Sequence, residues 1–346
     1  MESKFYDGTK LLNMTDLNGD KPEIYLCTGN RSAGKTTYFN RYLVNRFKKN
    51  KEKFCLLYRF QYELDNVADK FFKDINTLFF PKDIMTSEKR ERGIYHNLFL
   101  NDVHCGYAVS MNSADALRKN SHFFSDTARI LFDEFQSENN KYCADEITKF
   151  RSIHTTIARG QGKQNRYVPV IMLSNAVTLL NPYYTVFGIS SRLQKNTKFL
   201  RGNGYVLEFT LNEAARDSML ESAFNKAFQN DKYLSFAAEN VYLDDNSAFI
   251  EAPKGNNRYM GTLTYKGSNY GIRSYDDLGI VYISDKADIT YPFKIAVTTD
   301  DHNVNYVMLK KNDTFITALR WYFEKGCFRF KNLQSKSAIL TALSYY

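Results

Sequence analysis

Residues 29–36 have the sequence Gly29-Asn30-Arg31-Ser32-Ala33-Gly34-Lys35-Thr36, which matches the pattern G-x-x-x-x-G-K-[ST] at every fixed position. The apolar run Glu-Ile-Tyr-Leu-Cys-Thr over residues 23–28 precedes it and predicts a buried strand. An amphipathic helical pattern begins after Lys35. A strand, a glycine-rich turn and a helix in this order predict a loop whose backbone amides face bound phosphates.

The residue types within this stretch predict how it would hold a nucleotide. Glycines let the backbone curl so that successive N–H groups face the phosphates, and the helix N-terminus adds partial positive charge. We expect Lys35 to reach the β- and γ-phosphates and to act in catalysis, and the Thr36 hydroxyl to coordinate Mg²⁺. The predicted nucleotide-binding residues are therefore Gly29, Asn30, Arg31, Ser32, Ala33, Gly34, Lys35 and Thr36.

A second motif, which ends in two acidic residues, lies about a hundred residues downstream, in Ile130-Leu131-Phe132-Asp133-Glu134. An NTPase needs a carboxylate at a strand end to hold Mg²⁺, and hydrolysis needs a group that polarises water. We predict that Asp133 binds nucleotide-associated Mg²⁺ together with Thr36. Glu134 is then the general base, a residue typical of motor ATPases and generally lacking in signalling GTPases and nucleotide kinases.

A third strand end carries a candidate sensor of the γ-phosphate. The apolar run over 168–173 closes on Ser174-Asn175, and we assign Asn175 to the nucleotide site. The alternative is an asparagine that merely caps a strand before a turn. No N-K-x-D guanine motif follows, so the sequence favours ATP over GTP.

The remaining pattern predicts an α/β fold of the P-loop NTPase class, with a RecA-like parallel sheet covered by helices on both faces. Apolar strands are expected at 54–58, 105–111, 128–132 and 205–210, helices at 67–72 and 147–158, and an exposed charged turn at 88–93. A helix capped by Asn212 is expected to run to Asn230. Strands at 248–251, 259–265, 270–274, 280–284 and 294–298, followed by helices at 313–325 and 332–344, predict a smaller α+β domain. We place the ATPase domain at 1–210, a helical linker at 211–245 and the second domain at 246–346.

Composition bounds the class of protein. The chain has 346 residues, is 43% hydrophobic and carries a net charge of +9. No apolar run approaches the ~20 residues of a membrane span, and the N-terminus lacks a signal-peptide pattern, so we expect a soluble protein without a membrane partner. Five scattered cysteines without a C-x-x-C pair argue against a disulfide scaffold or a zinc site and fit a reducing cytosol.

Several motifs together resemble the genome-packaging ATPase of small short-tailed bacteriophages, a relative of the large terminase subunit. The resemblance is carried by Arg31, Phe132-Asp133-Glu134-Phe135, Leu173-Ser174-Asn175-Ala176 with Asn181-Pro182, Thr298-Thr299-Asp300-Asp301, and Gly326-Cys-Phe-Arg-Phe330. Tyr58-Arg59 with Glu63-Leu64 is similar to the segment after that family's second strand. The match is weakest at about 205–245.

The resemblance implies a homomeric ring, typically a pentamer, that drives double-stranded DNA through the portal into an empty prohead using ATP. It implies docking on the portal or connector, in some members through a structural packaging RNA. We expect the protein in the host cytoplasm, transiently attached to the portal vertex and absent from the mature virion. The resemblance implies that the second domain is similar to a degenerate RNase H-type nuclease that no longer cleaves nucleic acid. Two-metal cleavage needs three or four carboxylates that meet at one site, and no spacing in this sequence shows that the acids of the domain do so. These acids are Asp276, Asp277, Asp285, Asp288, Asp300 and Asp301.

Ring ATPases commonly complete the active site with a cation from a neighbouring subunit. Arg159, in Thr156-Ile-Ala-Arg159, matches the family's trans-acting arginine, although extra residues before 168 leave Lys163 and Arg166 as rivals. Lys119 matches a second trans-acting cation. Arg31 is a third basic residue near the phosphates. In larger terminases a phosphate-loop arginine is proposed to act in cis, and the role of Arg31 here stays open.

Positive charge is concentrated in three runs, at Arg41–Lys53, Arg192–Arg201 and from His302 to the end. Such runs suit contacts with DNA phosphates that read no sequence, or else solvated helix faces. Loops near Gln61 and Lys141 face the pore in similar motors. The alternatives to a packaging motor are another P-loop DNA motor, such as a helicase or DNA-transfer ATPase, and a nucleotide-regulated scaffolding protein that hydrolyses slowly.

Overall fold

The computed structural model describes residues 6–346 except 120, 139–140, 178–180, 191, 194–196, 228–249, 309–313 and 345–346. The residues group into two compact units, the first formed by Met1–Val177 with Lys198–Asn240 and the second by Thr178–Thr197 with Val241–Tyr346. The segment Thr178–Thr197, which we place in the first domain from sequence, groups with the second unit, where its helix α6 (Pro182–Val186) packs against α12 (Leu333–Ser344).

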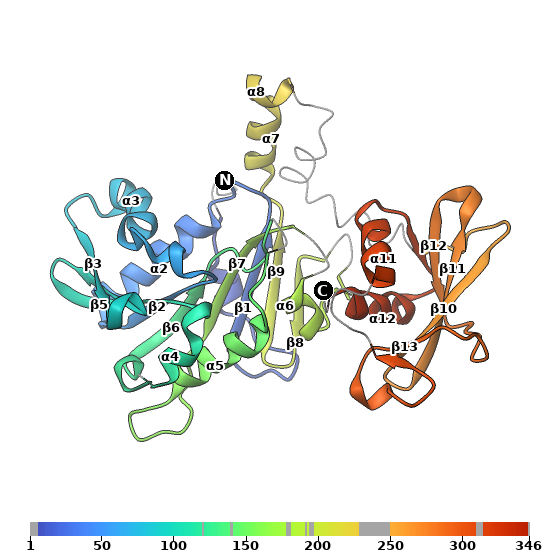
Figure 1. Ribbon diagram of the computed structural model, residues 1–346. Coiled ribbons are helices and arrows are strands. Elements are labelled where there is room, and N and C mark those ends of the chain that lie inside the picture. The colour runs from blue at the N-terminus through green and yellow to red at the C-terminus, as the bar shows by residue number, and fades with distance from the viewer. Residues whose placement is uncertain are drawn as a thin grey trace. The chain divides into compact units, whose positions relative to one another are not determined.

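The first unit is built on a nine-stranded sheet of order β3-β4-β5-β2-β6-β7-β1-β9-β8 (Figure 1). Its strands are β1 (Ile24–Gly29), β2 (Lys53–Tyr58), β3 (Met85–Arg90), β4 (Tyr95–Leu100), β5 (Val103–Ser110), β6 (Thr127–Phe132), β7 (Val170–Asn175), β8 (Phe199–Gly202) and β9 (Tyr205–Thr210). Six central strands, in the order β5-β2-β6-β7-β1-β9, are parallel to one another. The strands β3, β4 and β8 pair antiparallel at the two edges of the sheet. The predicted α/β class is confirmed.

Helices cover both faces of this sheet (Figure 1). They are α1 (Thr9–Leu12), α2 (Lys35–Asn50), α3 (Val67–Phe79), α4 (Ala114–Lys119) and α5 (Glu146–Ala158), with short 3-10 turns η1 (Gln61–Leu64), η2 (Glu91–Gly93), η3 (Met111–Ser113) and η4 (Ser121–Phe124). Alternate residues of a strand point to opposite faces. Phe54 and Leu56 of β2 join the core beneath α2 and α3, while Phe132 of β6 packs against Phe150 of α5 on the other face.

Two predictions about the first unit are wrong. The charged stretch at 88–93 is not all turn, because Glu88–Arg90 end the edge strand β3 and pair with β4. The helix from Asn212 does not continue to Asn230 through the described residues. Its N-cap is confirmed, since the Asn212 side chain accepts from the Ala215 amide, but Ser222 has an extended backbone that divides it into α7 (Glu213–Glu221) and α8 (Ala223–Lys226). The rest of that prediction lies outside the described residues.

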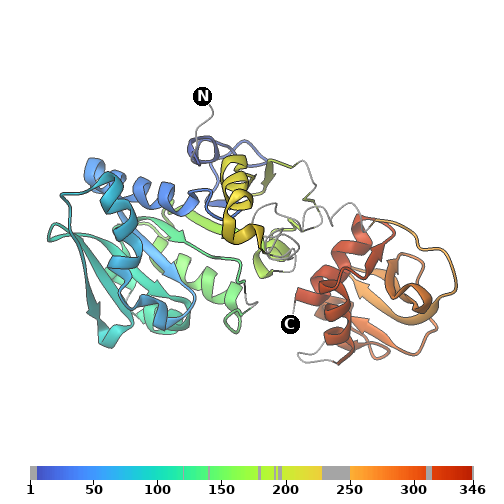
Figure 2. The same cartoon turned by 90° about the horizontal axis from the view of Figure 1, so that it is seen from above.

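The second unit has a six-stranded sheet of order β14-β13-β10-β11-β12-β15. Its strands and long helices are β10 (Arg258–Tyr265), β11 (Ser268–Tyr275), β12 (Ile280–Ser284), β13 (Lys294–Ala296), β14 (Val307–Met308), β15 (Phe328–Phe330), α11 (Thr314–Glu324) and α12, with 3-10 turns η6 (Asp276–Leu278) and η7 (Thr299–Asp301). The helices α11 and α12 lie side by side on one face of the sheet (Figure 1 and Figure 2). The strand predicted at 248–251 is not seen among its described residues, where Ile250 makes only a single bridge to Phe330.

Candidate nucleotide site

The predicted site residues converge where the parallel strands end. Gly29 of β1 is the register partner of Asn175 of β7, and β6 lies on the other side of β7, ending beside it and followed by Asp133. Ligands of open α/β sheets bind at the carboxyl ends of the strands. The fold therefore brings the phosphate-binding stretch, the acidic pair and Asn175 to one edge of the sheet.

The backbone of the phosphate-binding stretch needs glycine at two points. Gly34 has φ +91°, a left-handed conformation that precedes the first residue of α2. A Cβ on Gly29 would lie 2.4 Å from the carbonyl oxygen of Thr210, so the strand β9 leaves no room for a side chain there. Ser32 also has a positive φ, +59°, which completes the curl.

The Lys35 side chain is folded back onto its own loop. It is 6% exposed, and its Nζ donates to the carbonyl oxygens of Asn30 at 2.7 Å and Gly29 at 3.3 Å. Burial lowers the pKa of Lys35. An ammonium held by two neutral carbonyls in a nearly dry place gains much from an anionic partner, so this arrangement suits phosphate binding.

Thr36 and Asp133 meet across the site, as a shared metal role requires. The Thr36 hydroxyl donates to Asp133 Oδ2 at 2.9 Å, and the surrounding protein raises the pKa of the Asp133 carboxyl by burying it. A hydroxyl and a carboxylate are hard oxygen ligands of the kind that Mg²⁺ prefers, and this cation keeps its remaining positions for water and phosphate. The two side chains therefore fit a nucleotide-bound Mg²⁺.

Glu134 has an unusual backbone conformation. Its φ is +56°, in the left-handed region that non-glycine residues rarely adopt and that clusters at functional sites. Its amide donates to Asp133 Oδ1 at 2.9 Å, and the next amide, of the fully buried Phe135, donates to the Leu173 carbonyl at 3.0 Å. Partial burial and then the nearby charge of Asp133 raise the pKa of Glu134. A carboxylate with a raised pKa accepts a proton more readily, which suits a general base.

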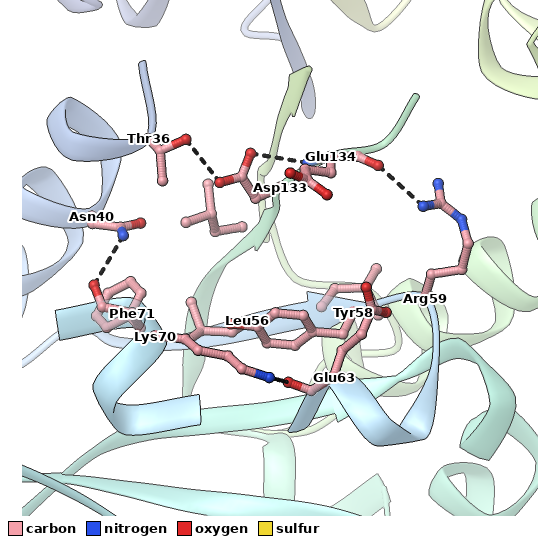
Figure 3. Close-up of a pocket in the computed structure, with 12 residues that line it drawn as sticks. Thr36, Asn40, Leu56, Tyr58, Arg59, Glu63, Lys70, Phe71, Asp133 and Glu134 are labelled. Carbon is pink, nitrogen blue, oxygen red and sulfur yellow. Dashed lines mark hydrogen bonds between the residues drawn. The ribbon is translucent and has the colours of Figure 1, made fainter. Parts of the chain in front are cut away.

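Arg59 holds this conformation in place, and we assigned it no role from sequence (Figure 3). Its guanidinium is buried and donates from Nη1 to the Glu134 carbonyl at 3.1 Å and from Nη2 to the Phe135 carbonyl at 2.8 Å. The Nε donates to Glu146 Oε2 at 3.0 Å in an ion pair whose carboxylate side chain is 2% exposed. Arg59 therefore ties the end of β2 to the backbone of the acidic motif.

Two hollows meet at the acidic motif. One, of about 230 Å³, is lined by the phosphate-binding stretch and by Ser174 and Asn175. The other, of about 200 Å³, is the pocket drawn in Figure 3. Glu63 of η1 and Lys70 of α3 line it across from Glu134, and Lys70 Nζ donates to the Glu63 carbonyl at 3.1 Å. Thr36, Asp133 and Glu134 line both hollows, so Glu134 stands between the phosphate position and a space that can hold water.

Glu138 is a further site residue that sequence reasoning missed. It forms an ion pair with Arg31 of the phosphate-binding stretch, and its Oε1 accepts from Asn175 Nδ2 at 3.2 Å. Burial opposes its ionisation, but these two donors outweigh burial and lower the pKa of Glu138. Arg31 and Asn175 are thus joined through one carboxylate, which no linear motif could reveal because Glu138 lies in a polar loop.

The Asn30 side chain points away from the phosphate position. Its Nδ2 donates to the Asn212 carbonyl at 3.0 Å, and its Oδ1 accepts from the Asn212 amide at 2.9 Å. Only the backbone of Asn30 is left to face a nucleotide. The side chain instead joins the phosphate-binding stretch to the first turn of α7.

Two of the predicted trans-acting cations, Arg159 and Lys163, lie at the opposite edge of the sheet from this site. Arg159 is exposed after α5, where a Cβ on Gly160 would lie 2.6 Å from Ser125 Cβ, just before β6 begins. Because β6 has six residues, its ends lie about 17 Å apart. Lys119 is exposed at the end of α4, and Lys163 is exposed in the turn after Gly160.

Among Arg159, Lys163 and Arg166, the residue least suited to act on a neighbouring subunit is Arg166. Its guanidinium donates to the carbonyl oxygens of Thr127 at 3.0 Å and Ile157 at 2.7 Å. These bonds fasten the end of α5 to the start of β6. A side chain used in this way within its own subunit is not available to a neighbour's nucleotide.

The acids of the second unit serve separate local contacts. Asp276 pairs with Arg258 at 3.4 Å, Asp285 pairs with Lys331 at 2.6 Å, and Asp301 accepts from the Lys266 and Gly267 amides. Across the described ranges of both units, no group of three or more His, Cys, Asp or Glu side chains could hold a metal ion. The same ranges contain no helix long and apolar enough to cross a membrane.

A parallel sheet, a phosphate-binding loop, a threonine–aspartate pair and an adjacent glutamate together define a P-loop ATPase. The family model described as podovirus DNA encapsidation protein (Gp16) matches residues 2–343. The chain therefore belongs to the podovirus DNA encapsidation protein family, and it is a DNA-packaging ATPase.

Similar proteins agree with this membership along the whole chain. The DNA packaging protein of Bacillus phage phi29 is 24% identical over 335 residues, which cover 96% of this chain and 94% of that protein. The fold is similar to that of the chain in the bacteriophage phi29 viral genome packaging motor assembly, with a TM-score of 0.60, 22% identity and coverage of 99% and 98%. The phi28 gp11 DNA packaging motor gives the same TM-score at 16% identity, with 98% of each chain covered.

Proposed function

We propose that the protein works as a homomeric ring of five copies that translocates double-stranded DNA through the portal into a preformed prohead. ATP with Mg²⁺ is the fuel. The observation that carries this proposal is the placement of Glu134, which lies beside the Thr36–Asp133 pair in a conformation held by Arg59. A nucleotide switch or scaffolding protein has less need of a base held in this way, whereas a motor must hydrolyse at every cycle.

The residues divide the work of hydrolysis among themselves. Lys35, now held by two loop carbonyls, would bind the phosphate oxygens of a nucleotide. Thr36 and Asp133 would hold Mg²⁺, and the ion would supply charge neutralisation at the phosphates. Glu134 takes the proton of the attacking water. Asn175 senses the γ-phosphate through Glu138 and Arg31, because a phosphate that attracts Arg31 weakens its ion pair with Glu138.

Arg159 and Lys119 are proposed to complete the site of the neighbouring subunit. Arg159 lies at the edge of the sheet opposite the nucleotide, so it is poorly placed to act within its own subunit. In rings that mix Arg159→Ala and Glu134→Gln subunits, we expect partial recovery of ATPase activity, because some interfaces join an intact arginine to an intact glutamate. Hydrolysis by mixed rings of varied composition measures this. Activity no higher than the two variants show separately would contradict action between subunits.

Binding to duplex DNA is expected to be independent of sequence and steeply dependent on salt. With about six phosphate contacts, affinity should fall roughly a thousandfold between about 50 and about 200 mM salt. Titration of fluorescent duplexes of several sequences at each salt concentration checks this, and a flat response would exclude phosphate contacts. The run Arg41–Lys53 is a weak candidate for these contacts, because four of its cations already have partners within the subunit. Arg41 lies over the Phe79 ring, and Arg46, Lys48 and Lys53 form ion pairs with Glu52, Asp83 and Asp126.

The partners and place of action follow from the same proposal. They are double-stranded DNA, further copies of the chain, the portal or connector of the prohead and, where the phage has one, a structural packaging RNA. The protein acts in the host cytoplasm and attaches transiently to the portal vertex. Stimulation of ATPase activity by duplex DNA and empty proheads, without strand separation, distinguishes this function from that of a helicase or DNA-transfer ATPase.

The second unit is proposed to bind nucleic acid without cutting it, as a degenerate RNase H-like domain. The separate contacts of Asp276, Asp285 and Asp301 support this, since two-metal cleavage needs carboxylates that converge.

A further inference from the structure

A third, larger hollow of about 580 Å³ opens in the first unit and shares no residue with either hollow of the nucleotide site. Its lining comes from the chain around η1, from the turn between β3 and β4, and from the start of η3. Its volume lies in the range of small-ligand sites. The proposed hydrolysis does not use it.

One wall of this hollow is a pair of stacked aromatic rings. The ring centroids of Phe60 and Tyr62 lie 5.5 Å apart with an interplanar angle of 11°. Tyr62 is 68% exposed, which is unusual for so large an apolar ring. A stacked neighbour fixes the orientation of an exposed ring, and a fixed ring offers its open surface to a planar group such as a nucleobase.

The rim of the hollow is positive. Lys89 and Arg92 line it against a single acid, Asp65. The Lys89–Asp65 pair spans 3.2 Å with both side chains about two-thirds exposed, so it is weak and easily exchanged for another anion. Arg92 is exposed and has no ion pair with any residue that the structure describes. Both cations are therefore accessible to a phosphate.

His96 adds a buried polar group that lacks a partner. The residue is 3% exposed, and its Nδ1 is buried without a hydrogen bond. Burial and then the charge of Lys89 lower the pKa of His96, so the ring is neutral near pH 7 and carries one donor and one acceptor nitrogen. A buried group of this kind is costly to leave unpaired, and the edge of a base would satisfy it.

We propose that this hollow binds one unpaired nucleotide of a nucleic-acid strand, with its base stacked on Tyr62 and bonded by His96 and its phosphate held by Lys89 and Arg92. A free nucleoside triphosphate is a poorer fit, because the two cations lie on an exposed rim. The proposal goes beyond duplex translocation, since a base enters the hollow only where a strand is unpaired.

Fluorescence of 2-aminopurine tests this with the full-length chain, because stacking on an aromatic ring quenches it. The probes are a short single-stranded DNA with one central 2-aminopurine, the RNA of the same sequence, the corresponding DNA duplex and free dAMP. We expect quenching with a single strand and not with the duplex, and weak binding of dAMP. Comparison of DNA with RNA shows which source of unpaired nucleotides is preferred.

Variants assign the binding to the hollow. Tyr62→Ala should weaken single-strand binding about tenfold, whereas Tyr62→Phe, which keeps the ring, should retain it. Arg92→Ala should lower affinity severalfold, and the matched control Arg90→Ala, whose side chain pairs with Glu88 at 3.0 Å and does not line the hollow, should not. His96→Phe should also weaken binding, because the ring is kept and the nitrogens are lost.

Four results would overturn the proposal: equal quenching by duplex and single strand, Tyr62→Ala binding within twofold of the unchanged protein, equal losses in Arg90→Ala and Arg92→Ala, or dAMP binding as tightly as a strand. ATP binding and hydrolysis are measured on the same samples and should be unchanged in Tyr62→Ala. If the unchanged protein does not hydrolyse ATP, the proposed motor function is contradicted, whereas the proposal that the hollow binds an unpaired nucleotide is not affected.

Discussion

Glu134→Gln should lower the rate of ATP hydrolysis by about a hundredfold to ten-thousandfold while leaving nucleotide binding nearly intact. Glutamine has the same shape as glutamate and can still orient a water molecule, but it cannot accept the proton. The proposed contacts with phosphate and Mg²⁺ come from Lys35, Thr36 and Asp133, and none of them uses the Glu134 side chain. Steady-state hydrolysis with DNA and proheads, together with titration of a fluorescent ATP analogue, separates the two effects.

The matched control for this variant is Glu88→Gln. Glu88 is an exposed glutamate on the edge strand β3, it pairs only with Arg90 among the described ion pairs, and it lies outside both hollows of the nucleotide site. It should hydrolyse ATP at the normal rate. Glu134→Gln activity within a few-fold of the unchanged protein would assign the general base to another residue, and Glu63, which faces Glu134 in Figure 3, would be the next to test.

Arg59→Ala should destabilise the first unit by about 3–5 kcal/mol, because it leaves the Glu146 carboxylate buried without its cation. It should also slow hydrolysis, since the carbonyl oxygens of Glu134 and Phe135 lose their donors. Urea unfolding measures the first effect, and hydrolysis well below the unfolding range measures the second. Arg59→Lys keeps the charge but not the forked donors, so it should recover part of the stability and little of the rate.

A double variant separates folding from positioning. Arg59→Met with Glu146→Gln removes both charges, so the penalty of an unpaired buried carboxylate disappears and stability should recover substantially. Hydrolysis should stay slow, because methionine cannot hold the backbone after Asp133. Normal hydrolysis by the double variant would show that Arg59 is needed for folding alone.

The sequence predicted the central sheet because its parallel strands are covered on both faces and are therefore apolar along their whole length. The strands β2 and β7, predicted at 54–58 and 168–173, are of this kind, and both lie in the middle of the sheet. The edge strand β3 could not be predicted in the same way. Most of its side chains are exposed, its sequence is Met-Thr-Ser-Glu-Lys-Arg, and its strand conformation depends on pairing with β4.

The residues of the candidate site also fall into two groups, those that local sequence predicts and those that depend on contacts between distant segments. Lys35, Thr36, Asp133 and Glu134 lie in motifs whose spacing follows from local geometry, so the sequence alone was enough to propose them as site residues. Arg59 could not be identified by local spacing, because its partner Glu146 is 87 residues away and the bond exists only once β2 and α5 are in place. Glu138 was missed for a similar reason, since it meets Arg31 across 107 residues.

The paired hydrogen bonds between Asn30 and Asn212 make the start of α7 part of the nucleotide site. The same asparagine, Asn212, caps α7 through the Ala215 amide, so a single residue fixes both the loop and the helix. A ligand that reshapes the loop at Asn30 must either keep this junction or give up a helix cap of about 1 kcal/mol. Occupancy of the nucleotide site and order in the first turn of α7 are therefore thermodynamically linked, and each reports on the other.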